Sequence, residues 1–438
     1  MMFRNLAFIA FLLLATPAWA TEQMFIGCPA NGDTASTTST EYLAPNGGTN
    51  WATDVNDKAA MIATAITLTD FKVVVDTAPG AGKSYTFTIV KAASGGAEAF
   101  GDTALSFTIS DTDTSGSDTG SVSVSAGEKL AIKSVPSGTP AATHLSFAIN
   151  FTPGTSNYSI LAGGGDADES VVDGSNHFIA SVSAANDYNP NATYVPFPVA
   201  GTLRNLYAEH YTACTAGEST TYTIYKNGSP TSLSVELGEA ETADSDTSNT
   251  VSISAGDYVH LECTEVNGPD NSNRYYGCVF IPSTTGYFMT VAGTTTGIVS
   301  TATAYRFVNG GDTSWSSDPD DFEGLIDSDD TVYMKAMAVR ANDAVYSGSI
   351  TCTVWNLTQS EDSSISVVLS SSETLDYSTG SYQVTTGDEV CFKYVSDAAT
   401  SRNLQYGIVW LIEAAAAAER GISNAVFTNA VITDAGGS

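Results

Sequence analysis

The residues with the clearest chemical potential in this sequence are carboxylates on two short segments. Asp111, Asp113 and Asp118 lie in the stretch DTDTSGSD, which opens like a calcium-binding loop, with acids at alternate positions before a glycine. The bidentate acid expected at the twelfth position of such a loop is replaced by Val122. These acids predict a partial Ca²⁺ site, and a solvated acidic loop is the alternative.

The second acidic segment, residues 318–330, carries seven acids within thirteen residues. Carboxylates at this density repel one another unless a cation or solvent screens them. We therefore predict that Ca²⁺ is the one possible cofactor, again with a solvated loop as the alternative. The candidate ligands are Asp318, Asp320, Asp327 and Asp329.

Aromatic residues recur at corresponding loop positions. Trp51 follows an Asn-Gly-Gly turn, Trp315 follows a second Asn-Gly-Gly turn, and Tyr188 lies near the same place between them. An aromatic side chain on a loop can stack on a sugar ring or anchor a subunit contact. The three residues are candidate ligand or assembly contacts, and the alternative is that each caps the core of its own domain.

Motifs for nucleophilic or phosphate chemistry are weak. The segment APGAGKS (78–84) resembles the end of a phosphate-binding loop, but Thr77 replaces the first glycine and a strand-like run follows where a helix must begin. We expect a hairpin turn there. The four histidines are scattered, with no H-E-x-x-H and no G-x-S-x-G motif. The sequence therefore predicts no catalytic residue.

The elements that position these residues are written three times. Residues 121–132 read SVSVSAGEKLAI, residues 250–261 read TVSISAGDYVHL, and residues 381–392 read SYQVTTGDEVCF. A repeat of about 130 residues indicates tandem copies of one domain. We expect domains at 21–155, 156–284 and 285–413, followed by an Ala-rich linker and a terminal strand at 414–438.

Each copy has the pattern of an all-β domain. Runs such as FKVVVD (71–76), YTFTIV (85–90) and ALSFTIS (104–110) are rich in β-branched and aromatic residues and are bounded by Gly, Pro, Asp and Ser. The repeated segment alternates polar and apolar residues, as a half-buried strand does. Many short strands separated by turns predict three β-sandwich or jelly-roll-like domains.

The C-terminal end carries a further β-prone run, ISNAVFTNAVIT (422–433), behind the helix-forming stretch EAAAAAER. The three copies leave this run without a partner strand. We expect it to pair with a sheet edge of a neighbouring subunit, and the alternatives are folding back on the third domain or fraying. Its candidate assembly contacts are Ile422, Val426, Phe427 and Val431.

The N-terminus predicts export. Arg4, an apolar run over residues 6–15 and the A-x-A site at 18–20 form a signal peptide spanning residues 1–20. This run is too short to span a bilayer, and no other apolar run approaches the length needed. Export to an oxidising compartment favours disulfides among the six cysteines, with Cys352 and Cys391 as the first candidate pair and buried free thiols as the alternative.

Composition narrows the possible partners. The chain has 438 residues, with 48 acidic and 16 basic side chains and a formal net charge of −32. Nucleic acid and anionic membrane surfaces both require a basic face, so this charge excludes them as general partners. A hydrophobic fraction of 42% is enough to form cores, which excludes a disordered chain.

The first copy carries a resemblance to a known module. The segments 77–95 and 115–142 resemble a tandem β-module of uncharacterised secreted and phage-like surface proteins. That resemblance implies a fold and carries over no functional residue. Taken together, the sequence predicts a secreted, self-assembling subunit of an extracellular filament, sheath or surface layer. A glycan-binding or adhesive module that binds polysaccharide or a cell surface is the alternative, and a polysaccharide-active enzyme is less favoured.

Overall fold

The computed structural model describes residues 22–95, 99–164, 175–177, 193–268, 274–293, 302–311, 315–342, 348–397 and 403–413. This part of the chain is almost entirely β-structure, arranged in six sheets. Its helices are short 3₁₀ turns: η1 (Ala30–Gly32), η2 (Val55–Lys58) and η4 (Pro319–Phe322). The all-β prediction is confirmed. The predicted signal peptide and residues 414–438 lie outside the described residues.

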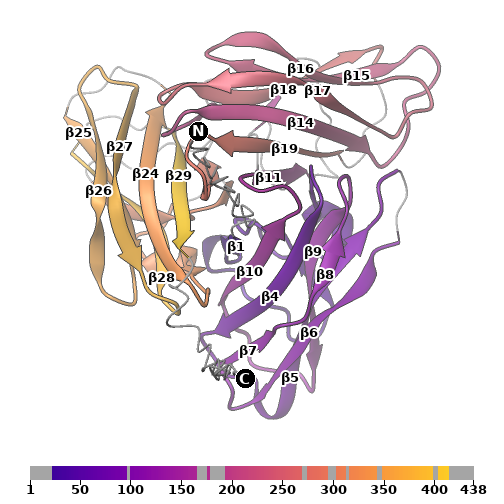
Figure 1. Ribbon diagram of the computed structural model, residues 1–438. Coiled ribbons are helices and arrows are strands. Elements are labelled where there is room, and N and C mark those ends of the chain that lie inside the picture. Colours follow the sequence, from indigo (N-terminus) through magenta and orange to yellow (C-terminus); the bar gives the residue numbers. More distant parts are fainter. Residues whose placement is uncertain are drawn as a thin grey trace, which may run out of the picture.

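The six sheets form three sandwich-like pairs, each with its own hydrophobic core (Figure 1). In sandwich 1, the first sheet has the order β1-β10-β4-β7, with β8 also on β4, and the second has the order β2-β9-β5-β6, with β3 also on β9. The bounds are β1 (Gln23–Gly27), β2 (Glu41–Leu43), β3 (Ala60–Met61), β4 (Ile66–Val75), β5 (Gly80–Ala92), β6 (Gly101–Asp111), β7 (Ser115–Asp118), β8 (Val122–Val124), β9 (Lys129–Ser137) and β10 (Leu145–Pro153).

Sandwich 2 follows with the orders β11-β19-β14-β17 and β12-β18-β15-β16, and β13 also pairs with β18. Its strands are β11 (Ser159–Gly164), β12 (Ser175–His177), β13 (Val195–Pro196), β14 (Gly201–His210), β15 (Ser219–Lys226), β16 (Ser229–Leu237), β17 (Ala243–Ile253), β18 (Tyr258–Val266) and β19 (Arg274–Pro282).

Sandwich 3 has the orders β22-β20-β29-β24-β27 and β21-β28-β25-β26, and β23 also pairs with β28. Its strands are β20 (Tyr287–Gly293), β21 (Thr303–Arg306), β22 (Gly310–Gly311), β23 (Gly324–Leu325), β24 (Thr331–Ala341), β25 (Ser349–Asn356), β26 (Glu361–Ser370), β27 (Leu375–Val384), β28 (Glu389–Ser396) and β29 (Leu404–Glu413). Strands in corresponding places therefore pair alike in all three sandwiches.

The repeated sequence segment makes the same turn each time. Gly127, Gly256 and Gly387 have φ angles of 84°, 87° and 91°, a backbone region that glycine occupies without strain. The acid that follows each glycine closes the turn. In sandwich 1, for example, the backbone N–H of Ser125 donates to the Glu128 carboxylate at 2.6 Å. The motif is thus a structural turn motif, because both of its distinctive residues are used by the backbone.

The chain crosses between the two sheets of sandwich 1 at the place where the sequence predicts a hairpin. β4 belongs to the first sheet of sandwich 1 and β5 to the second, so the residues joining them cross from one sheet to the other. Residues 80–84 form the start of β5, so the hairpin predicted for the segment 78–84 is wrong. The prediction failed because strand pairing in a sandwich is decided by non-local contacts, which a turn sequence does not encode.

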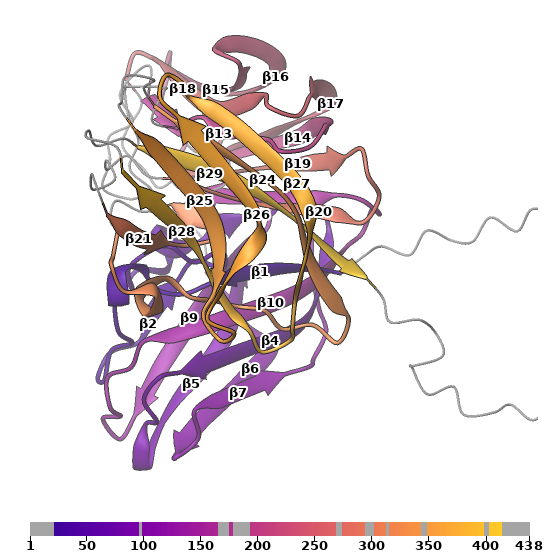
Figure 2. The same ribbon diagram turned by 90° about the vertical axis from the view of Figure 1, so that its left-hand side faces the viewer.

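The three sandwiches pack against one another in a closed ring (Figures 1 and 2). Successive side chains of a strand point to opposite faces of its sheet. In each opening strand, one face enters the core of its own sandwich and the other enters the core of a neighbour. Sandwich 1 thus contributes to the core of sandwich 3, sandwich 2 to that of sandwich 1, and sandwich 3 to that of sandwich 2. The residues that cross are Met24 and Ile26 from β1, Ile160 and Ala162 from β11, and Met289 and Val291 from β20.

Glycine permits the close approach at two of these junctions. A Cβ on Gly277 in β19 would lie 2.6 Å from the backbone oxygen of Met61 in β3. A Cβ on Gly407 in β29 would lie 2.5 Å from the backbone oxygen of Pro196 in β13. Both distances are shorter than any real contact, so a side chain at either place would push two sandwiches apart.

Candidate metal centre

A histidine and two carboxylates meet where sandwich 3 contacts sandwich 1. Asp76 directly follows β4 and His144 directly precedes β10, and these antiparallel strands end together because Val75 pairs with Leu145. Glu323 comes from sandwich 3, at the C-terminal end of η4 and before the short strand β23. Two sandwiches therefore supply the three side chains.

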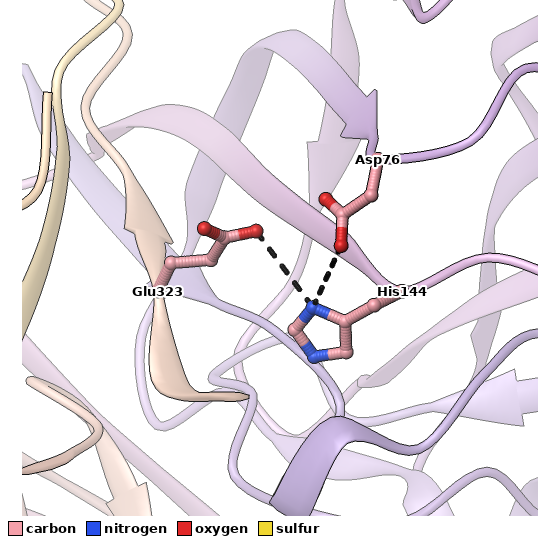
Figure 3. A group of neighbouring side chains, drawn as sticks. All are labelled: Asp76, His144 and Glu323. Atoms are coloured by element: carbon pink, nitrogen blue, oxygen red, sulfur yellow. Dashed lines mark ion pairs between the residues drawn. The ribbon is translucent and has the colours of Figure 1, made fainter. Parts of the chain in front are cut away.

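The three side chains converge on one point (Figure 3). His144 Nδ1 lies 3.8 Å from Asp76 Oδ2 and 3.7 Å from Glu323 Oε1. One ligand atom from each residue lies within 4.8 Å of the other two. Within the described residues, this is the one group of three or more His, Cys, Asp or Glu side chains with that spacing. It is the strongest candidate for a metal-binding site in the described chain.

His144 is held from behind by the backbone. Its side chain is 8% exposed, and Nε2 lies 3.4 Å from the carbonyl oxygen of Pro29. Nδ1 is buried and has no hydrogen-bond partner. At 3.7 and 3.8 Å, Nδ1 is too far from the two carboxylate oxygens to form a hydrogen bond with either.

Further acids surround the centre. A cleft of about 410 Å³ is lined by Asp76, Glu323, Asp320 and Glu389, together with Leu357 and Thr358. Glu389 accepts a hydrogen bond from Ser146 Oγ in sandwich 1 at 2.7 Å. The Asp76 side chain is 48% exposed and that of Glu323 is 6% exposed, so the centre borders the cleft and is open to solvent on the side of Asp76.

The protonation of these groups reflects burial and crowding. Burial, reinforced by the carboxylates of Glu389 and Asp76, raises the pKa of Glu323 to about 7, although His144 opposes the shift. Burial also raises the pKa values of Asp76, Asp320 and Glu389. Burial alone would lower the pKa of His144, but the neighbouring carboxylates outweigh it and the pKa is raised. The centre therefore favours the presence of positive charge.

The donor set decides which cation fits. Imidazole nitrogen suits Zn²⁺, Cu²⁺, Fe²⁺ and Ni²⁺, and carboxylates serve most divalent ions. Ca²⁺ binds six to eight oxygen ligands, and a histidine at the centre of the site does not suit it. Three protein donors and a side open to solvent match a four-coordinate ion that keeps one water.

The predicted calcium ligands of sandwich 1 are not among the three residues of the centre, although the turn that carries Asp113 lies beside Asp76, where the backbone N–H of Val75 donates to the carbonyl oxygen of Thr114 at 2.8 Å. Asp111 ends β6 and Asp118 ends β7, on either side of a turn that contains Asp113. The Asp111 carboxylate accepts the backbone N–H of Gly82 at 2.6 Å, and the Asp118 carboxylate accepts that of Ser106 at 3.0 Å. The turn and its partner strands account for these two carboxylates, and Ca²⁺ binding here stays a prediction.

The predicted ligands of sandwich 3 are spread along the interface. Asp318 caps η4 by accepting the backbone N–H of Asp320 at 3.2 Å, and Asp320 lines the cleft. Asp327 forms an ion pair with Lys72 of sandwich 1 at 2.7 Å, and Asp329 is exposed. Of the four, the structure brings Asp320 to the candidate centre, beside Glu323.

The two described loop tryptophans hold equivalent places. Each precedes a residue that bridges to the first strand of the second sheet, Ala52 to Tyr42 and Ser316 to Tyr305. Trp51 packs against the core of sandwich 1 and Trp315 against that of sandwich 3. Their role as ligand contacts stays a prediction. The third aromatic candidate, Tyr188, lies outside the described residues, as do Ile422, Val426, Phe427 and Val431.

The predicted Cys352–Cys391 disulfide is not formed. All six cysteines are free and buried. Cys352 points into the core of sandwich 3, whereas Cys391 lies in a separate cluster with Cys28 and Phe322. The two thiols face opposite sides of one sheet, although they lie on the neighbouring strands β25 and β28. The prediction failed because sharing a sheet does not place two side chains on the same face.

Sandwich 2 contains a cysteine–histidine contact that lacks the features of a catalytic pair. Cys214 Sγ lies 3.9 Å from His210 Nδ1, and His210 Nε2 lies 2.9 Å from the hydroxyl of Tyr222. Burial, assisted by the charge of Arg274, lowers the pKa of His210 to about 3, and burial raises that of Cys214. Both groups are therefore neutral near pH 7, and the thiol lacks the thiolate that nucleophilic chemistry requires.

Sequence reasoning missed the centre of Asp76, His144 and Glu323. The run FKVVVD (71–76) is predicted to be a strand, but its sequence does not indicate the pairing with β10 that places Asp76 beside His144. Nothing local in the sequence indicates that Glu323 joins them from sandwich 3.

The sequence matches no protein-family model and no curated protein. Among the described residues, no helix has the length and apolar character needed to cross a membrane.

Proposed function

We propose that this protein is a secreted structural protein whose three tandem β-sandwich domains, residues 21–155, 156–284 and 285–413, form one subunit of an extracellular filament, sheath or surface layer. The signal peptide over residues 1–20 supports export. A structural subunit works by presenting rigid surfaces at fixed angles, which this architecture supports.

The observation that carries the proposal is the cyclic packing of the three sandwiches. Each opening strand contributes side chains to two cores, so none of the sandwiches can move without disrupting a neighbour's core. Apolar burial of this kind is the main favourable term in association. The result is a rigid three-lobed block, as expected of a building unit.

Sheet edges supply the proposed contacts between subunits. β26 is the last strand of its sheet and, among the described strands, pairs with β25 alone. An unpaired strand edge is a template for a strand from another chain. The β-prone run at 422–433 would add to such an edge on the next subunit. Val368 on β26 is 41% exposed and would lie at this contact.

The test is negative-stain electron microscopy of the chain from Thr21 to Ser438. We expect regular filaments or sheets, and a chain ending at Glu413 should remain dispersed. Assembly of the shortened chain to the same extent would contradict strand addition by the C-terminal run.

Three-lobed particles that stay dispersed under all conditions would contradict the structural role itself. Glycan screening, with Trp51 and Trp315 each replaced by alanine, would then be the next step.

A further inference from the structure

We propose that Asp76, His144 and Glu323 bind one divalent transition-metal ion of the Zn²⁺ type, which joins sandwich 3 to sandwich 1. The ion acts within a single chain, so this site does not depend on the assembly proposed above.

The first argument is the unsatisfied nitrogen of His144. When Nε2–H donates to the carbonyl of Pro29, the lone pair of Nδ1 points at the carboxylates of Asp76 and Glu323. A lone pair facing two carboxylates is repulsive unless a cation lies between them. Metal-binding histidines commonly donate their second ring N–H to a backbone carbonyl or a carboxylate, because that bond fixes the ring orientation. His144 has this support.

The second argument is the spacing of the donors. The ligand atoms of tetrahedral Zn²⁺, with bonds of about 2.0–2.1 Å, lie roughly 3.3–3.5 Å apart. Nδ1 of His144 lies 3.7 and 3.8 Å from the two carboxylate oxygens. These two distances exceed that spacing by a few tenths of an ångström, and one ligand atom of each residue lies within 4.8 Å of the others, so rotation of the carboxylates can draw the three donors together around one ion. The cleft leaves room for a water as the fourth ligand.

The third argument is a comparison of the three sandwich interfaces. Three residues, one in each sandwich, hold equivalent positions in the repeated fold. Each pairs with the second residue of a two-residue strand, which is β3 in sandwich 1, β13 in sandwich 2 and β23 in sandwich 3. They are Lys129 in sandwich 1, Tyr258 in sandwich 2 and Glu389 in sandwich 3.

In two of the interfaces a cationic side chain either holds this position or packs against the residue that does. Lys129 pairs with Glu209 of sandwich 2. Tyr258 lies against the guanidinium of Arg340 of sandwich 3, with 4.6 Å from the ring centre to Cζ. In the third interface, Glu389 accepts a hydrogen bond from Ser146. Val74 of sandwich 1 holds the strand position that Glu209 holds in sandwich 2 and Arg340 holds in sandwich 3. At this position the interface that carries the acidic cleft thus lacks the cationic side chain found in the other two, and its ion pair between Lys72 and Asp327 lies at another place.

A bound ion would complete the ring. Sandwiches 1 and 3 are connected along the chain only by way of sandwich 2, so their interface is the one without a covalent link of its own. A metal that joins Asp76 to Glu323 lowers the conformational entropy of the state in which sandwiches 1 and 3 have separated, as any cross-link over a long loop does. The ion would therefore strengthen the junction that chain connectivity leaves weakest.

The test is zinc titration of the metal-stripped chain from Thr21 to Ser438, followed by isothermal titration calorimetry and by Tm. We expect one Zn²⁺ per chain and a higher Tm in its presence. Ca²⁺ or Mg²⁺ at the same concentration should not displace the zinc, because the imidazole ligand disfavours both ions.

Near-isosteric variants keep the test independent of folding. Glu323→Gln and Asp76→Asn preserve side-chain volume, and His144→Ala removes the nitrogen donor. Each should weaken Zn²⁺ binding by at least 10- to 100-fold, the loss usual even for groups that merely support a ligand. Asp244→Asn is the matched control, since that acid is exposed on β17 of sandwich 2, which supplies none of the three ligands, and the variant should bind Zn²⁺ as the unmodified chain does.

Zinc located by anomalous diffraction between His144 and Glu323 would support the site directly. The proposal is overturned if the stripped chain binds no zinc in a one-to-one ratio, which would leave His144 as an imidazolium in an ion pair only. It is equally overturned if Glu323→Gln and His144→Ala bind zinc as tightly as Asp244→Asn does, or if Ca²⁺ raises the Tm and Zn²⁺ does not.

Discussion

The ammonium of Lys129 in sandwich 1 pairs with the carboxylate of Glu209 in sandwich 2, and both side chains are fully buried. The ring of Tyr275 lies under the ammonium, 5.0 Å from its centroid. Ser94 also donates a hydrogen bond to Glu209 at 3.0 Å. A charge pair of this kind holds its interface in one arrangement, because neither charge can be left alone in an apolar environment.

Breaking this ion pair should destabilise the protein strongly. Glu209→Gln leaves the Lys129 ammonium buried without its counter-charge, which should cost about 3–5 kcal/mol of unfolding free energy. The double variant Lys129→Met/Glu209→Leu should recover most of the loss, since well-packed apolar residues replace buried ion pairs at little cost. Urea unfolding of both variants tests this. A double variant less stable than the single one would show that the pair itself contributes net stability.

The glycine junction between sandwiches 2 and 3 should not tolerate a side chain. Gly407→Val places atoms 2.5 Å from the carbonyl oxygen of Pro196, so the backbone must shift. We expect a loss of at least about 2 kcal/mol, the range of overpacked cores. Gly101→Val is the control, because no atom lies within 4 Å of its added Cβ. Equal unfolding midpoints for the two variants would contradict the tight junction.

His210 should make the stability of the protein depend on pH. Its pKa falls to about 3 in the folded chain, because of burial and the charge of Arg274, against an unfolded value of about 6.5. Between these values the unfolded chain takes up a proton that the folded chain refuses. The stability that neutral His210 contributes is therefore complete above about pH 6.5 and is lost as the pH falls toward 3.

A substitution isolates this effect from that of the carboxylates. His210→Gln cannot titrate, so its stability relative to the unmodified protein should rise as the pH falls, by up to about 1.4 kcal/mol per pH unit. Urea unfolding at pH 7.0, 6.0, 5.0 and 4.0 measures the difference. Parallel stability curves for the two proteins would mean that His210 titrates alike in both states.

The six thiols should be protected while the protein is folded. All are buried and free, and burial raises the pKa of Cys263 to about 12 and that of Cys278 still further. Since the thiolate is the reactive form, a thiol reagent should label none of them in the native protein and all six after denaturation. Fewer than six labelled thiols in non-reducing denaturant would reveal a disulfide. Mass spectrometry would then identify the pair.

Local sequence patterns predict the elements and their threefold repetition. Strands over residues 71–76, 85–90 and 104–110 were predictable because a half-buried strand alternates its side chains with a period of two. The turns at Gly127, Gly256 and Gly387 were predictable because a positive φ angle selects glycine. Both signals are local, so neighbouring residues are enough to show them.

Tertiary structure decided which of these elements meet. Cys352 and Cys391 share a sheet but face opposite sides of it, and residues 76–79, between β4 and β5, cross from one sheet to the other. His144 and Glu323 come together only because the third sandwich closes on the first. Such contacts depend on strand register and on packing between sandwiches, which sum many weak interactions over the whole chain. No local pattern marks their outcome, and for that reason the candidate metal centre emerged from the fold.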